Sequence, residues 1–470
     1  MKTTYKLILS FIFLIATISC DDYLDVNENK NQLVEVPTGT LLLKGTLLAN
    51  AQIQQGHLSR VSMYYTGGLI GKQLVQQTLY NYDYTPGDSN GTWSQLYNGV
   101  LVQNKEIRRL SPNLDRLNGI IDVNEALAVG TATSLFGDIP YSMAVPDDAS
   151  LNSPDPTYDA QADVYASLQT LLDGAITKLT NSTTAVGSED IYNNGNKTKW
   201  IQAANTLKAR FYLETKQYAQ ALNYVGSGIS SAANTLAYHP IGSVDGNSNI
   251  LSNFVTSTRA GDMTGTGAFY RDFIDPANSN SRNNAKTDES ARRKYTFISG
   301  NGEQTGGIDD PTTPMKLVSY EENLLIWAEC LLRTGDTQGA IDKLNVLRAY
   351  LNSGNAFNVL GGETYMYAPY VMADFQAGGM ENMDSIDVDR AVLREIIEER
   401  YVTGFSTFMP FNDARRLKKS DSDVIVPFPL NNNTTTVNPQ RLLYPQSEIN
   451  ANSNTPSPIP DLFTPTPVNQ

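Results

Sequence analysis

Two segments far apart in the chain follow one pattern: Ala209-Arg-Phe-Tyr-Leu-Glu-Thr-Lys-Gln-Tyr-Ala-Gln-Ala221-Leu222 and Ala328-Glu-Cys-Leu-Leu-Arg-Thr-Gly-Asp-Thr-Gln-Gly-Ala340-Ile341. Each begins with a small alanine, which is followed three positions later by a bulky residue, Tyr212 or Leu331. A short polar turn and a second alanine come next in both segments. The shared spacing indicates one structural unit that occurs twice.

The correspondence continues beyond the second alanine, at Val225 and Leu344. Two helices that cross closely need a small residue at the crossing and larger residues where they diverge. The pattern therefore predicts two tetratricopeptide-like helical hairpins that form a scaffold. Because repeat arrays normally contain three or more units, two unrelated amphipathic hairpins remain the alternative. Both interpretations predict a mainly α-helical fold with long loop-rich elaborations.

Length and composition limit the class of protein. The chain has 470 residues, of which 40% are apolar and 18% are charged, and this balance is typical of a globular protein. One large domain or two tightly joined ones would hold a chain of this size, and we expect a single domain over residues 39–470. The formal net charge of -14 repels phosphate backbones and anionic lipid, so the composition excludes nucleic acid as a partner.

The N-terminus has the features of an export signal. Residues 1–19 contain two lysines and then the apolar run Leu7 to Ile15, which is too short to span a bilayer. Cys20 follows directly after a small residue, as in the lipobox of bacterial lipoproteins, which predicts lipidation of Cys20. Thr17 and Ser19 also satisfy the small-x-small rule of ordinary signal cleavage, which would leave Cys20 as a free thiol.

Cysteine use agrees with a lipid anchor. The chain has only Cys20 and Cys330, so acylation of Cys20 would leave no pair for an intramolecular disulfide. Cys330 lies within a helical apolar pattern and is predicted to be a small core residue. Residues 20–38 are expected to form a polar tether between the lipid and the folded domain.

Tyrosines cluster in the N-terminal part of the chain. Tyr64 and Tyr65 are adjacent, and Tyr80, Tyr82 and Tyr84 alternate. In an extended segment, alternation places three rings on one side. Exposed phenol rings stack on sugars and donate hydrogen bonds, so these five tyrosines are candidate ligand-binding residues. The alternative is that they cover the flank of a helix.

Several short motifs occur in order along the chain. They are Ser19-Cys20-Asp21-Asp22, Gly137-Asp138-Ile139-Pro140-Tyr141-Ser142, Lys199-Trp200, Ala204-Asn205-Thr-Leu207-Lys-Ala-Arg210, Ala328-Glu329, Asp413-Ala-Arg415-Arg416, Pro439-Gln-Arg441, Tyr444-Pro445 and Glu448. As an ordered set they resemble the SusD/RagB family over nearly the whole chain. The resemblance implies a cell-surface lipoprotein of Bacteroidetes-type bacteria that captures glycans or peptides. It also implies a SusC-like TonB-dependent transporter as partner, and family members are not enzymes.

The helical signal fades between about residues 231 and 314 and again from about residue 424. A long loop inside a compact domain is usually functional, so we expect the first segment to fold over the helices and the C-terminal tail to wrap the body. The resemblance implies that the middle segment carries ligand contacts. Phe269, Tyr270 and Arg271 are therefore further candidate ligand-binding residues.

No residue pattern predicts catalysis, a metal site or a cofactor. Glu395 and Glu399 lie one helical turn apart, a spacing that is compatible with a pair of catalytic acids, but Arg394 and Arg400 are beside them. Solvated ion pairing on one helix explains this pattern better. The two histidines lack metal-ligand spacing, and no serine lies in a Gly-x-Ser-x-Gly elbow.

Three functions compete at this stage. The first is an outer-membrane, lipid-anchored and surface-exposed protein that binds a polysaccharide, oligosaccharide or peptide and delivers it to the transporter. The second is a helical-repeat adaptor on the periplasmic side that binds only protein. The third is a secreted glycan hydrolase, which is disfavoured because neither an acid pair nor a nucleophile stands in a suitable context.

Overall fold

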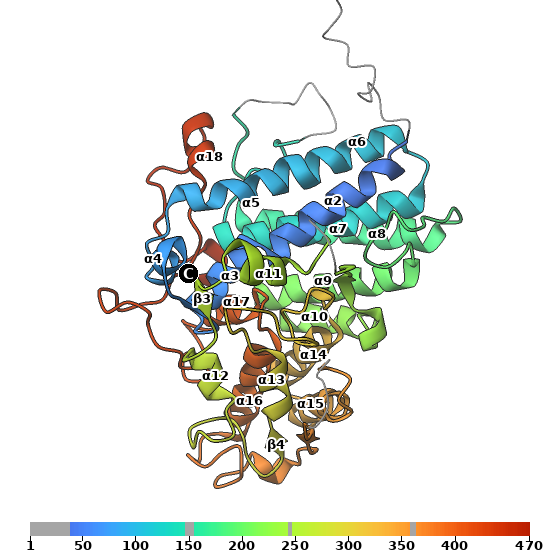
Figure 1. The fold of residues 1–470 in the computed structure, drawn as a ribbon. Helices are drawn as coiled ribbons and strands as arrows, with labels where there is room; N and C mark the ends of the chain where they lie inside the picture. Colours follow the sequence, from blue (N-terminus) through green and yellow to red (C-terminus); the bar gives the residue numbers. More distant parts are fainter. Residues whose placement is uncertain (1–37, 146–154, 243–246, 358–362) are drawn as a thin grey trace, which may run out of the picture.

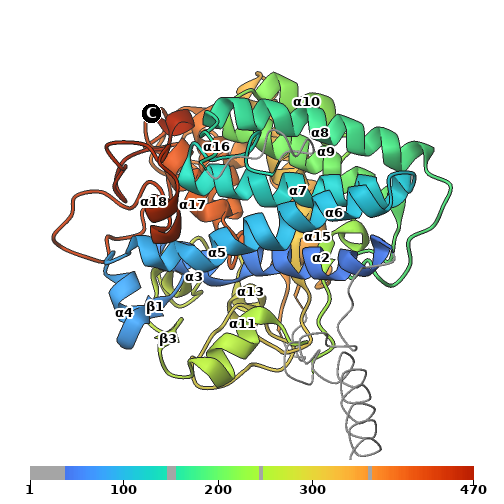
Figure 2. The same cartoon turned by 90° about the horizontal axis from the view of Figure 1, so that it is seen from above.

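The structure is a computed structural model that describes residues 38–145, 155–242, 247–357 and 363–470. The predicted signal peptide at 1–19, Cys20 and the tether up to residue 37 lie outside the described residues. The described part is mainly helical, as predicted (Figures 1 and 2).

Long helices alternate with short helical turns along the chain. The α-helices are α2 (Thr40–Gln55), α3 (His57–Tyr65), α4 (Leu74–Tyr80), α5 (Asn90–Ser94), α6 (Val102–Leu110), α7 (Asp115–Phe136), α8 (Gln161–Asn181), α9 (Lys197–Glu214), α10 (Tyr218–Val225), α11 (Ile250–Asn253), α12 (Phe269–Phe273), α13 (Ser290–Tyr295), α14 (Tyr320–Arg333), α15 (Thr337–Asn352), α16 (Val388–Thr403), α17 (Met409–Arg416) and α18 (Gln446–Ala451). The 3-10 turns and π-helices are η1 (Pro86–Ser89), η2 (Gln95–Leu101), η4 (Ala232–Asn234), η5 (Phe254–Thr258), η6 (Met372–Asp374) and η7 (Pro467–Asn469).

Short antiparallel strand pairs tie the irregular segments to the helical body. The pairs are β1 (Ile70–Gly71) with β3 (Met263–Thr264), β2 (Leu236–Tyr238) with β5 (Met315–Val318), and β4 (Thr287–Asp288) with β6 (Met366–Tyr367). In each pair, one strand belongs to residues 231–314 and the other lies outside that segment. The middle of the chain is therefore fastened at three places.

The two predicted hairpins form, and their turns have the same geometry. In α9–α10, the N–H of Gln217 donates to the carbonyl of Tyr212 at 2.7 Å. In α14–α15, the N–H of Asp336 donates to the carbonyl of Leu331 at 2.9 Å, which is the corresponding pair of positions. The residue before each donor has a left-handed backbone. α10 also packs on α14, so the two hairpins stack side by side (Figure 1).

An N-terminal layer of helices packs beside the first hairpin. α7 packs along α8 and on α2 and α9 (Figure 2). α7 approaches α9 closely because position 130 is glycine: a Cβ atom on Gly130 would lie 2.3 Å from Cζ of Phe211. Asn50 and Asn124 join α2 to α7 by a buried hydrogen bond of 2.8 Å between their side chains.

The C-terminal tail lies against the helical body with little regular structure of its own. The N–H of Leu442 donates to the carbonyl of Leu135 at 2.9 Å, and the guanidinium of Arg441 donates to the carbonyl of Phe136. Both contacts satisfy carbonyl groups at the C-terminal end of α7, where a helix leaves such groups unpaired. The tail therefore stabilises the scaffold by capping the C-terminal end of α7.

Helix α16 carries buried ion pairs on the face that had been predicted to be solvated. Glu395 and Glu399 are 4% and 1% exposed. Arg282 lies 2.8 Å from Glu395 and 3.0 Å from Glu399, and Arg292 lies 2.7 Å from Glu399. Glu289 contacts both arginines. The prediction of solvated pairing is wrong, because the partners come from a distant segment that covers this face.

Candidate ligand-binding site

Tyr64 and Tyr65 lie at the C-terminal end of α3, and both are buried. The hydroxyl of Tyr64 donates to Oε1 of Gln76 at 2.9 Å. The ring of Tyr65 packs edge-on against Tyr82, with 5.3 Å between ring centres, and also contacts Phe411. Burial raises the pKa of both phenols. Neither ring presents an open face to a ligand.

Tyr80, Tyr82 and Tyr84 do not form an exposed row of rings. Tyr80 ends helix α4, and Tyr82 has a left-handed backbone with φ of 69°, so the segment is not extended there. Tyr82 and Tyr84 are buried, while Tyr80 is half-buried. The hydroxyl of Tyr82 donates to Asn438 at 2.8 Å and accepts from the N–H of Asn431 at 2.9 Å. The prediction of an exposed row is wrong because the C-terminal tail covers these side chains.

The structure brings the second candidate group beside the first. The N–H of Tyr270 in α12 donates to the carbonyl of Gly67 at 3.0 Å, directly after α3. Tyr270 and Arg271 are buried. Phe269 is half-buried and stacks on Phe273, with 5.5 Å between ring centres. Of the eight predicted contact residues, Tyr80 and Phe269 are half-buried and the other six are buried.

A pocket of about 380 Å3 opens beside α12 and α13. We call it the α13 pocket. Its residues include the cations Arg271, Arg293 and Lys294, the ring of Phe297 and the carboxylate of Glu363. The guanidinium carbon of Arg271 lies 4.7 Å from the centre of the Phe297 ring, and Lys294 lies 3.0 Å from Glu363. A charged and aromatic surface of this kind suits stacking and hydrogen bonding to a polar ligand.

Arg271 is the most distinctive cation of the α13 pocket. Within the part of the chain that the structure describes, it pairs with no carboxylate, and its guanidinium donates to the carbonyl of Arg293. Burial, and then the neighbouring charge of Arg293, lower the pKa of Arg271 to about 10. The group is still cationic at neutral pH, so it offers a positive charge to a ligand.

One feature of the sequence, a short basic run, belongs to this pocket and was not predicted as part of a site. Arg292, Arg293 and Lys294 form a basic run in an acidic chain. In the structure Arg292 points into the ion-pair network under α16, whereas Arg293 and Lys294 line the pocket. A short basic run divided between two faces of one helix is not visible from composition alone.

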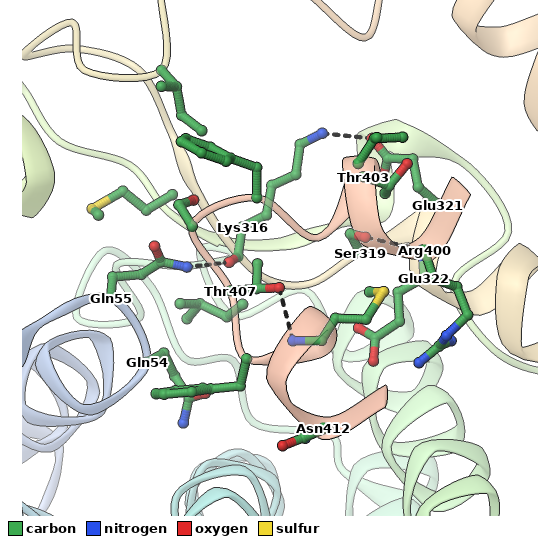
Figure 3. Close-up of a pocket in the computed structure, with 18 of the residues that line it drawn as sticks. Gln54, Gln55, Lys316, Ser319, Glu321, Glu322, Arg400, Thr403, Thr407 and Asn412 are labelled. Carbon is green, nitrogen blue, oxygen red and sulfur yellow. Dashed lines mark hydrogen bonds and ion pairs between the residues drawn. The ribbon is translucent and has the colours of Figure 1, made fainter. Parts of the chain in front are cut away.

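A second, interior cavity lies at the centre of the scaffold and measures about 130 Å3 (Figure 3). Gln55 donates from Nε2 to the carbonyl of Lys316 at 2.7 Å, and Lys316 pairs with Glu321 at 2.5 Å. Labelled residues from α2, α14, α16 and α17 point into it. Its polar groups mostly satisfy one another, and a polar cavity of this size admits water. Ligand pockets usually measure roughly 300 Å3 or more, so this cavity is too small for an oligomeric ligand.

The described ranges contain neither a membrane-spanning helix nor a cluster of metal ligands. None of the helices there is long and apolar enough to cross a membrane. Nor do the described residues contain a group of three or more His, Cys, Asp or Glu side chains placed to hold a metal ion. Cys330 is buried in the scaffold, as predicted, and burial raises the pKa of its thiol to about 12.

Comparison with known proteins identifies the family. Residues 30–445 match a family model described as SusD-like and as starch-binding, associating with the outer membrane. The chain belongs to the SusD-like family. This confirms the resemblance drawn from the short motifs and the mainly helical fold. A search of curated proteins gave no match.

Solved structures of SusD-like proteins have the same fold. A SusD/RagB family protein from Bacteroides thetaiotaomicron is 19% identical, with a TM-score of 0.67 over 89% of this chain and 95% of the other. A SusD homologue from Bacteroides fragilis is 17% identical, with a TM-score of 0.66 over 92% and 100%. A chitin-binding SusD homologue from Flavobacterium johnsoniae is 18% identical, with a TM-score of 0.61 over 87% and 94%. At these identities the likeness concerns the fold alone.

Proposed function

We propose that this SusD-like protein binds a nutrient, either a glycan or an oligopeptide, at the cell surface and delivers it to a SusC-like TonB-dependent transporter in the outer membrane. The observation that carries the proposal is the family match over residues 30–445, with its description as starch-binding and associated with the outer membrane. The protein acts by capture and release and makes or breaks no bond. Lipidation of Cys20 fastens it to the membrane.

The ligand is held on the face that carries α12 and the α13 pocket. Arg271 and Phe297 supply charge and stacking within the pocket. Tyr80 and Phe269 are half-buried and do not line it, so they are candidates for apolar contact outside the pocket. Tyr64, Tyr65, Tyr82, Tyr84 and Tyr270 are buried and are not expected to contact the ligand. An open surface of this kind gives affinities from about 1 mM to about 1 μM, or about -4 to -8 kcal/mol. Weak affinity suits a protein that must release its ligand to a transporter.

Binding without catalysis is supported by the positions of the acids that first suggested a hydrolase. Glu395 and Glu399 are buried and engaged with Arg282 and Arg292. A glycoside hydrolase needs two carboxyl groups that flank the scissile bond in an accessible site. These two carboxylates act instead as cross-links between α16 and the middle segment.

Titration calorimetry tests the binding step. The soluble chain that begins after Cys20 is titrated with starch, chitin and peptide oligomers, and each ligand is then analysed for cleavage products. We expect at least one class to bind and remain intact. Phe297→Ala should weaken binding tenfold or more, a loss of about 1.4 kcal/mol. Phe463→Ala, another half-buried phenylalanine but on the C-terminal tail, is the matched control and should leave the affinity unchanged. Cleavage products, or no binding by any class, would contradict the proposal.

Experiments in cells test the location and the partner. Radiolabelled palmitate should enter the parent chain and not Cys20→Ala. Protease added to intact cells should degrade the parent, whereas a periplasmic adaptor would survive. Purification of the parent from solubilised outer membranes should recover a TonB-dependent transporter in near-equal amount. A protein that survives protease treatment and carries no label would support the adaptor instead.

A further inference from the structure

A second surface pocket, lined by none of the residues of the α13 pocket, lies between the start of α3 and the segment α11–η5. Figures 1 and 2 show α11 beside α2 and α3. The pocket measures about 270 Å3, and we call it the α3 pocket. Leu48, Ile250 and Phe254 form apolar walls, and His57 and Arg60 supply the nitrogen groups from α3.

Arg60 is a buried cation without an acid. It is 7% exposed, and its guanidinium carbon lies 3.5 Å from the centre of the Phe254 ring. Among the described residues its side chain makes neither an ion pair nor a hydrogen bond, and its Nε is buried without an acceptor. Burial lowers the pKa of Arg60 only to about 10, so it is charged at neutral pH.

Other buried arginines of the scaffold have acceptors from the chain, either carboxylates or backbone carbonyls. Arg348 donates to the carbonyls of Ala368 and Lys286, and Arg415 donates to the carbonyl of Ser134. Arg282 and Arg292 contact Glu289 and Glu399, and Arg416 contacts Glu329 at 2.6 Å. A buried guanidinium normally requires such a partner, because removal of the charge from water is costly when nothing compensates it. Arg60 differs in that its side chain has no acceptor of either kind among the described residues, so its guanidinium is open to an acceptor from a ligand.

The start of α3 adds two further features that favour an anion. The helix has nine residues, begins at His57 without a side-chain cap and has no acidic residue in its first turn. The backbone N–H groups of this first turn lie beside the pocket, directly after the C-terminal end of α2. His57 has a buried Nε2 without a partner. Burial and then Arg60 lower the pKa of His57 to about 4, with Asp88 opposing them, so the imidazole is neutral and adds no second charge.

We propose that the α3 pocket binds the carboxylate of a small acidic ligand, with the Arg60 guanidinium as its ion pair. One cation balances a single negative charge, which favours a carboxylate over a phosphate. The planar guanidinium matches a carboxylate in two parallel hydrogen bonds. The volume lies just below the roughly 300 to 1,000 Å3 of pockets for larger ligands, so one sugar-sized or amino-acid-sized unit fits. The apolar walls contact the body of that unit.

Calorimetry on the soluble chain tests this site with four probes: glucuronate, an N-acetylated amino acid, glucose and inorganic phosphate. We expect glucuronate or the acetylated amino acid to bind, and the one that binds tells whether the carboxylate comes from an acidic sugar or from a peptide. Glucose and phosphate should show no binding that Arg60→Met weakens. Absence of binding by both carboxylates, or tighter binding of phosphate, would overturn the proposal.

Two variants locate the carboxylate. Arg60→Met should weaken binding at least tenfold, whereas Arg259→Met, which removes the same charge from an exposed residue of the neighbouring segment, should change it less than twofold. Equal effects of both variants would show diffuse electrostatic attraction and refute the site. In the absence of ligand, Arg60→Met should melt at or above the parental temperature, because it removes an unpaired buried charge. A fall in melting temperature larger than loss of the Phe254 contact causes, about 2 kcal/mol of stability at most, would mean that Arg60 has an acidic partner within the chain, and the proposal would fail.

Discussion

The most discriminating stability prediction concerns Glu399 in α16. Replacement by glutamine keeps the size of the side chain and removes its charge. Glu399 lies 2.7 Å from Arg292 and 3.0 Å from Arg282, and it is 1% exposed. The variant would leave Arg282 with Glu289 and Glu395 as its carboxylate partners, and Arg292 with Glu289.

The expected loss follows from the charge balance of the network. Burial alone would raise the pKa of Glu399, but Arg292 and Arg282 outweigh burial and lower it from about 4.5 to about 2. At about 1.4 kcal/mol per unit, that shift corresponds to about 3 kcal/mol of stability. Removing one partner of a buried ion pair costs roughly 3 to 5 kcal/mol by experience with other proteins. The value from the pKa shift and the value from other buried ion pairs agree, so Glu399→Gln should lower the free energy of unfolding by about 3 kcal/mol or more.

Glu395 is the matched control, since it lies on the same face of α16 and also contacts Arg282. Burial raises the pKa of Glu395 well above its usual range, whereas Arg292 and Arg282 lower that of Glu399, so burial opposes the charged form more strongly at Glu395 than at Glu399. Glutamine mimics a protonated glutamate, so Glu395→Gln should change the free energy of unfolding by about 1 kcal/mol or less. Urea unfolding at pH 7 measures both variants. Equal losses of unfolding free energy in the two variants would refute the unequal contributions of Glu399 and Glu395.

The pH dependence gives a second measure of the same network. Because the pKa of Glu399 is depressed, its contribution is fully present above about pH 4.5 and disappears as the pH falls towards 2. The stability difference between the parent and Glu399→Gln should therefore shrink over that range. A difference that stays constant down to pH 2 would mean that packing, and not charge, causes the loss.

Three further predictions test other parts of the fold. Burial raises the pKa of Glu398 to about 7, so ionisation of this side chain destabilises the folded protein as the pH rises from about 4.5 to about 7. Glu398→Gln should therefore raise the melting temperature at pH 8 and leave it unchanged at pH 4. Gly130→Ala should destabilise by about 1 to 3 kcal/mol in urea unfolding, because its Cβ would lie 2.3 Å from Cζ of Phe211, and Gly130→Ala combined with Phe211→Leu should recover part of that loss. Cys330 should resist alkylation by iodoacetamide in the folded protein at pH 8 and react fully in urea, since its thiol is buried and its pKa is raised to about 12. Rapid labelling without urea would show that the scaffold opens locally.

The hairpins could be predicted because their information is local. The alanines at 209, 221, 328 and 340 are all fully buried at helix crossings. Each lies within a few turns of the residues that it packs with, so periodicity along the sequence was sufficient. The polar turns of the two hairpins also match each other, since Lys216 and Gly335, the residues before the two N-caps, both have a left-handed backbone. Local spacing predicts helices that pack on their chain neighbours.

The candidate site could not be predicted in the same way, because distant segments decide exposure. Tyr82 is covered by Asn431 and Asn438, which lie about 350 residues later in the chain. Glu395 looked like a solvated helix residue because its partner Arg282 is 113 positions away. Alternation and charge spacing give the direction of a side chain relative to its own element. They give no information about the segment that packs on top of it.

The consecutive basic residues of helix α13 serve both stability and binding. Arg292 is fixed from below by Glu399 and Glu289, while the next two residues, Arg293 and Lys294, line the α13 pocket. The ion pairs under α16 therefore set the position of two pocket cations without contact with a ligand. A pocket supported in this way is pre-organised, since α13 does not have to be ordered when the ligand arrives. Glu399→Gln should therefore weaken ligand binding at the α13 pocket even under conditions in which the variant is fully folded, whereas Glu395→Gln should not.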